Sequence, residues 1–235
     1  MRGTVLGDDQ SDDRGNDRDD QRRVRKLRDR YAPDLKRWVV HNGSLRRTDW
    51  TGIPRGYARG IAAADHAESI VVRERGEEIR FAFKDLSRFH GPGSPGGVAH
   101  AFKVMERALP VLEPDGIPER REIRVRTAFG GPGARDGFEC ALRAVSNGRY
   151  EVDPALARAE LGRARERFVF TLTYRDRTAT LVVRDGFVTE EFLNLARRED
   201  RTSAEQEQLV AMKLEMADRV MSAPAAGVYD VAESA

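Results

Sequence analysis

Two hairpin patterns set among helical segments constrain the fold of this chain more than any other feature. Residues 168–183 are rich in β-branched and aromatic side chains on either side of a polar turn at 175–177. Residues 69–83 alternate apolar and polar side chains around a similar turn at 75–77. Both patterns are typical of antiparallel β-hairpins, so we expect a fold that contains antiparallel strands.

Helical segments separate and follow the hairpins. Residues 98–109 carry one apolar face that ends at Pro110, a half-buried strand is predicted at 121–129, and a further helix at 136–145. A C-terminal helix begins at Ser203, which resembles the first residue of a capping box. Because helices and strands do not alternate as βαβ units, the sequence predicts an α+β fold with a small mixed, partly antiparallel sheet and flanking helices.

The N-terminal part of the chain has a different composition. We expect residues 1–22, rich in Asp, Arg, Gln and Gly, to be a disordered charged tail. A short amphipathic helix is predicted at 23–37, followed by an irregular loop at 42–60. The chain then divides into this tail, an N-terminal extension at 23–88 with a helix, a loop and a β-hairpin, and a domain at 89–235.

The composition excludes several classes of protein. The single cysteine, Cys140, permits no intrachain disulfide and no multi-cysteine zinc site, and we expect it to be a small core residue. With 41 basic and 39 acidic residues, we expect no nucleic-acid partner. No segment approaches the ~18 consecutive apolar residues of a membrane span, and the first residues lack the apolar core of a secretory signal. We therefore expect a cytoplasmic protein without membrane contact.

Two glycine-rich loops, at 91–97 and 130–133, each open a predicted helix. Glycine lets a backbone approach a ligand closely, and a helix N-terminus favours anions. If the loops face each other, they form a pocket suited to a carboxylate, a phosphate or an enolate. The alternative is that both are tight turns without a ligand. The first loop has G-x-G-x-x-G spacing, but a helix precedes it, which argues against dinucleotide binding.

The side chains best suited to chemistry lie at these loops. His90 precedes the first loop, and Asp136 lies near the start of the helix after the second. A His–Asp pair is suited to general acid–base catalysis, although a structural histidine and a helix-capping aspartate are the alternatives for each residue alone. We assign substrate binding to the residues around them: Gly93, Ser94, His100, Gly133 and Arg135.

At residues 89–96 the sequence Phe-His-Gly-Pro-Gly-Ser-Pro-Gly resembles the F-H-G-H-x-C-P-G signature of the formylmethanofuran dehydrogenase E-subunit-like family. The following helix, the strand that leads toward Asp136, the hairpin at 168–183 and the ending at 209–231 are similar in kind and order. The resemblance implies a small α+β domain with a mixed sheet, a homodimer, and a bound metal such as zinc.

The sequence departs from that signature at the metal-binding positions. His90 and Asp136 are kept, but Pro92 replaces the second histidine, Ser94 replaces the cysteine, and Gly133 replaces the cysteine before the aspartate. Zinc sites normally use three or four N, S or O ligands. We therefore predict no metal and no other cofactor.

Two functions are compatible with these residues. The first is a metal-independent acid–base enzyme, of lyase, cyclase or isomerase type, that acts on a small anionic or carbonyl-containing metabolite, with a tailoring step in specialised metabolism as one setting. His90 would transfer the proton, Asp136 would orient it, and Ser94 and loop N–H groups would stabilise negative charge. The alternative is a non-catalytic small-molecule-binding or accessory protein. The enzyme hypothesis requires His90 and Asp136 within ~6 Å of each other in one solvent-accessible pocket.

Overall fold

The computed structural model describes Arg22, Lys26, residues 38–41 and 44–47, and residues 69–232. Apart from the isolated helical positions Arg22 and Lys26, the predicted tail at 1–22 and the predicted helix at 23–37 lie outside these residues, as does most of the predicted loop at 42–60. In the described part of the loop, β2 (Ser44–Arg47) pairs antiparallel with β1 (Trp38–His41). The prediction of an irregular loop was therefore wrong at 44–47, where no apolar alternation marks the strand.

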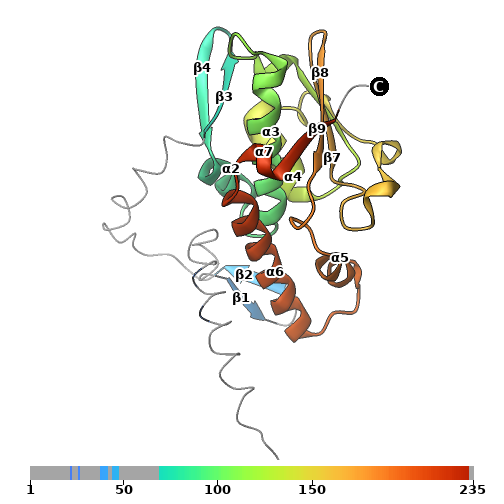
Figure 1. The fold of residues 1–235 in the computed structure, drawn as a ribbon. Helices are drawn as coiled ribbons and strands as arrows, with labels where there is room; N and C mark the ends of the chain where they lie inside the picture. Colours follow the sequence, from blue (N-terminus) through green and yellow to red (C-terminus); the bar gives the residue numbers. More distant parts are fainter. Residues whose placement is uncertain (1–21, 23–25, 27–37, 42–43, 48–68, 233–235) are drawn as a thin grey trace, which may run out of the picture.

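The fold is of mixed α+β type, as predicted, and its main element is a five-stranded sheet (Figure 1). The strand order is β6-β5-β7-β8-β9, in which β6 runs parallel to β5 and the other neighbours are antiparallel. The predicted hairpin at 168–183 is confirmed as β7 and β8. The strand bounds are β5 Ile123–Thr127, β6 Tyr150–Val152, β7 Val169–Tyr174, β8 Arg177–Val183 and β9 Tyr229–Ala232.

The hairpin predicted at 69–83 is also confirmed, as β3 (Ser69–Glu74) and β4 (Glu77–Ala82). Its two-residue turn places Arg75 and Gly76 at positive φ, which matches the right-handed twist of the paired strands. Ile70 and Val72 are buried and belong to the same hydrophobic core as the large sheet. The described residues 69–232 therefore share one core.

Helix α3 lies at the centre of this core (Figure 1). It packs against helices α2, α4 and α6 and against strands β7, β8 and β9. A helix enclosed in this way is apolar on nearly all sides. None of the helices in the described residues is long and apolar enough to cross a membrane. The helix bounds are α2 Phe83–His90, α3 Pro95–Leu112, α4 Pro132–Leu142, α5 Glu190–Arg197, α6 Ser203–Met221 and α7 Ala225–Val228.

Three predicted helix ends differ from the structure. Helix α3 continues through Pro110 to Leu112, because a proline in the last turn removes only one helical hydrogen bond and the burial of Leu109 and Leu112 offsets the loss. Helix α4 begins at Pro132, whose fixed φ suits a first helical turn. Helix α6 is capped one residue earlier than predicted, by Thr202.

Candidate functional site

The two glycine-rich loops are in direct contact. A methyl group built on Gly133 would lie 2.9 Å from the backbone nitrogen of Val98 and closer still to the carbonyl oxygen of Ser94. One built on Gly97 would lie 3.1 Å from the backbone nitrogen of Ala134. Any side chain at these positions would force the backbones apart. Glycine therefore allows the N-terminal turns of α3 and α4 to meet backbone to backbone, as expected if the loops face each other.

This contact brings His90 and Asp136 together. His90 is the last residue of α2, and Asp136 lies in the second turn of α4. The Nδ1 atom of His90 is 2.8 Å from Oδ2 of Asp136, a hydrogen bond between residues 46 positions apart. The His90 side chain is 7 % exposed and that of Asp136 27 %. The ~6 Å distance expected of an acid–base pair is met. The expected solvent-accessible pocket is not found at His90 among the described residues, because its imidazole is almost covered while the carboxylate of Asp136 reaches solvent.

Among the described residues, the second ring nitrogen of His90 has no hydrogen-bond partner. Nε2 is buried and makes no hydrogen bond, although buried polar atoms are normally paired. A methyl group built on Gly93 would lie 3.7 Å from Nε2, which is an ordinary van der Waals distance. Gly93 itself is exposed. A methyl group at Gly93 would therefore fit in contact with Nε2 without a clash.

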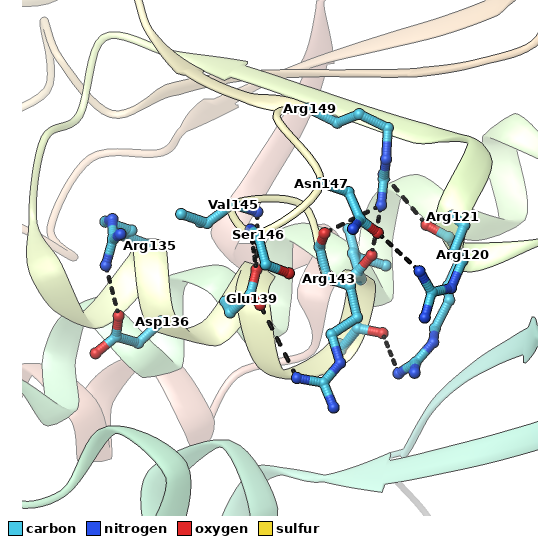
Figure 2. A network of polar contacts seen from close by, with 12 residues as sticks. Arg120, Arg121, Arg135, Asp136, Glu139, Arg143, Val145, Ser146, Asn147 and Arg149 are labelled. Atoms are coloured by element: carbon cyan, nitrogen blue, oxygen red, sulfur yellow. Dashed lines mark hydrogen bonds and ion pairs between the residues drawn. The ribbon is translucent and has the colours of Figure 1, made fainter.

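The aspartate is fixed on its other side by Arg135. Oδ1 of Asp136 lies 3.3 Å from Nη1 of Arg135, whose side chain is half exposed (Figure 2). Tyr150 is close enough for the charges of both residues to act on its hydroxyl. Burial raises the pKa of Tyr150 to about 12, Arg135 lowers it, and Asp136 raises it. Tyr150 is therefore a neutral hydrogen-bonding group at neutral pH.

The C-terminal end of α4 is held by a separate polar network (Figure 2). Arg149 donates from Nη2 to the carbonyl oxygens of Leu142 and Arg143, at 2.8 and 3.2 Å. Glu139 accepts from the backbone nitrogens of Val145 and Ser146, at 2.8 and 3.0 Å. These bonds satisfy groups that a helix end leaves unpaired. They fix the helix that carries Asp136.

Helix α6 adds a lysine that the sequence patterns did not single out. Nζ of Lys213 donates to the carbonyl oxygen of Gly93 at 2.9 Å, across 120 residues of chain. Lys213 follows buried Leu209 by one helical turn and precedes buried Met216 by nearly another. In the sequence, a lysine within an apolar helical stripe is the signal that indicates an inward-facing charge.

Of the residues assigned to substrate binding, Arg135 contacts Asp136 and Gly93 adjoins His90, whereas Ser94 and Gly133 meet each other where the two loops touch. His100 lies elsewhere. Ser94 is the residue before α3 and makes no capping hydrogen bond with its side chain. The His100 side chain is 0 % exposed, and its Nδ1 lies 2.7 Å from the hydroxyl oxygen of Tyr229. Burial lowers its pKa to about 3. His100 is a neutral core residue, and we leave it out of the candidate site.

Cys140 is half-buried and packs against the core, and burial raises the pKa of its thiol. This placement confirms its prediction as a core residue.

The donor set at the two loops fits a metal ion poorly. His90 has Nδ1 engaged by Asp136, and the adjoining positions Pro92 and Gly133 have no side-chain donor. Within residues 69–232 and the shorter described segments, no group of three or more His, Cys, Asp or Glu side chains gathers in a metal-binding arrangement.

Comparison with known proteins gives no family assignment. Neither a scan of protein-family models nor a search of curated proteins finds a match to this chain. A function is therefore inferred from the geometry of the site.

Proposed function

We propose that this protein is an acid–base enzyme that works without a metal and moves a proton on a small anionic or carbonyl-containing metabolite, in a lyase, cyclase or isomerase reaction. The observation that carries the proposal is the 2.8 Å bond between His90 Nδ1 and Asp136, with Nε2 buried and without a hydrogen-bond partner in the described part of the chain. A carboxylate beside Nδ1 favours the tautomer with the proton on that nitrogen. Nε2 then holds the lone pair that accepts a proton from a substrate.

The surrounding groups suit the charges that such a reaction creates. When Nε2 takes a proton, the imidazolium that forms is stabilised by Asp136. The negative charge left on the substrate lies near the N-terminal turn of α3, where the helix dipole favours anions. Ser94 stands at the start of this helix with a hydroxyl that is not used as a cap.

Access to Nε2 depends on the first glycine loop. Nε2 has almost no contact with solvent, so the proposed reaction requires a movement that uncovers it, and Gly93 of the first loop lies beside it. Gly91 ends α2 with φ at +81° and ψ at −167°, a conformation that glycine adopts without strain. We infer that this junction is the hinge of the movement.

We also propose that the scaffold is that of the formylmethanofuran dehydrogenase E-subunit-like proteins and that the protein is a homodimer. The segment 89–96 that resembles the family signature forms the junction of α2 and α3. The segment with Asp136 lies beside it in α4. On this proposal the scaffold keeps its histidine and aspartate and has lost its metal ligands.

Proton exchange tests the function without knowledge of the complete reaction. The protein is incubated in D2O with a panel of small 2-oxo and 3-oxo acids, and loss of each acidic C–H signal is followed by proton NMR. We expect His90→Gln to lower the exchange rate by about 10²- to 10⁴-fold. Arg88→Ala is the matched control, because Arg88 is an exposed residue on the same helix. This variant should catalyse exchange at the wild-type rate. Equal rates for His90→Gln and wild type would rule out His90 as the base.

The covered position of Nε2 also favours a second function, that of a non-catalytic small-molecule-binding protein. In that case a ligand would bind in a manner that depends on His90 but would exchange no protons. The same panel, followed by ligand-observed NMR, separates this outcome from catalysis.

A further inference from the structure

The inward-facing side of α6 is apolar except at one position. Leu209, Met216 and Val220 are buried on it, and Met216 covers Gly96, where an added methyl group would lie 2.8 Å from its sulfur. Lys213 occupies the same side, is half-buried, and donates to Gly93. A lysine here costs more than an apolar residue would, since burial disfavours an ammonium group. Its position therefore calls for a reason other than packing.

Positive charge gathers at this point without a compensating carboxylate. Within the described residues, no carboxylate lies within ion-pair distance of Lys213, whose hydrogen-bond partner is a neutral carbonyl. Burial lowers the pKa of Lys213, and the charge of Arg201 lowers it further. The N-terminal turn of α3, which follows Gly93 directly, adds the positive end of a helix dipole. Asp136, on the other side of the loop, is already bonded to His90 and Arg135.

We propose that Lys213 binds the carboxylate or phosphate group of the small molecule on which His90 acts. This inference rests on the proposed function and names the class of substrate. An ammonium has three N–H donors, of which Gly93 takes one. The others are directed to an anion that approaches over the exposed loop.

The geometry also limits the size of this substrate. Gly93 lies between the two side chains: its carbonyl oxygen is 2.9 Å from Nζ of Lys213, and a methyl group built on its Cα would lie 3.7 Å from Nε2 of His90. A molecule that contacts both groups therefore carries its acidic C–H only a few bonds from its anionic group. Small 2-oxo or 3-oxo acids and phosphate esters of similar length meet this condition.

Anion binding by the full chain tests the inference separately from catalysis. Inorganic phosphate and acetate are titrated in turn at constant ionic strength, and the backbone amide signals of Gly93 and Ser94 are followed by two-dimensional NMR. We expect Lys213→Met to weaken binding on the order of 10- to 100-fold while the apolar side of α6 stays packed. Arg219→Met is the matched control, because Arg219 is an exposed cation on the same helix that also donates to a loop carbonyl, that of Gly186 at 3.1 Å.

The outcomes separate the two proposals. Phosphate binding alone indicates a phosphate ester, and acetate binding alone indicates a carboxylate. If Lys213→Met binds both anions as tightly as wild type, or if wild type binds neither, the anion site is refuted even when His90 proves essential for exchange. If binding depends on Lys213 but wild type exchanges no proton on any acid of the panel or on carbonyl-containing phosphate esters of similar length, the anion site stands and the acid–base function falls.

Discussion

The close contact of the two glycine loops can be tested by a single methyl group. In Gly133→Ala the new carbon would lie 2.9 Å from the nitrogen of Val98 and 3.1 Å from Cα of Gly97, whereas carbon atoms pack best at ~3.5–4.0 Å. The obstructing atoms belong to the backbone of α3, so α3 and α4 must move apart. Overpacking of this kind costs about 1–3 kcal/mol. For a domain of this size that corresponds to a melting temperature lower by about 2–12 °C.

The matched control is Gly130→Ala, in the same loop. A methyl group there would lie 3.8 Å from Val152, an ordinary contact. Both substitutions restrict the unfolded chain equally, which by itself stabilises a protein by about 0.4–1 kcal/mol. The difference between their urea midpoints therefore measures the clash. If Gly133→Ala unfolds at the same urea concentration as Gly130→Ala, the backbone contact described above is absent and the two loops do not form the site.

Two further predictions concern stability away from the loops. His100 has a pKa of about 3 in the folded protein and ~6.5 when unfolded. Between these values only the unfolded chain binds the proton, so the free energy of unfolding falls as pH drops below ~6.5. In urea unfolding, the decrease in this free energy from pH 7 to pH 5 should be about 2 kcal/mol larger for wild type than for His100→Gln. An equal loss would show that His100 is not a buried neutral residue. Thr202 accepts from the backbone nitrogen of Glu205, so Thr202→Ala should lower stability by about 1 kcal/mol in the same assay. Ser203→Ala should leave the stability unchanged. If Ser203→Ala destabilised the protein and Thr202→Ala did not, Ser203 would be the cap.

The sequence predicts those elements of the fold whose pattern lies within one short segment. A hairpin such as β7–β8 has its alternation and its turn within one short segment, so its pattern is complete in the sequence. Strand β6 has only three residues and pairs with β5 through a parallel register, and β9 joins the edge of the sheet far from β8 in the chain. Neither pairing leaves a local pattern, and neither strand was predicted.

The site shows the same division. His90 and Asp136 were found because each adjoins a glycine loop, and their 2.8 Å bond agrees with the expected proximity. His100 was assigned to the site because it is near Ser94 in sequence, but the turn of the helix directs it toward Tyr229 in the core. Lys213 was missed because a lysine in a helix usually indicates the solvent-exposed side.

The central position of α3 has a consequence for how this protein responds to change. His90, Asp136 and Lys213 are carried by α2, α4 and α6, and each of these helices packs on α3. The spacing of the three polar groups therefore depends on how these helices pack on α3, which meets α4 backbone to backbone at Gly97 and Gly133 and is covered by Met216 of α6 at Gly96. Core substitutions in α3 should therefore disturb the His90–Asp136 and Lys213–Gly93 contacts before they unfold the chain.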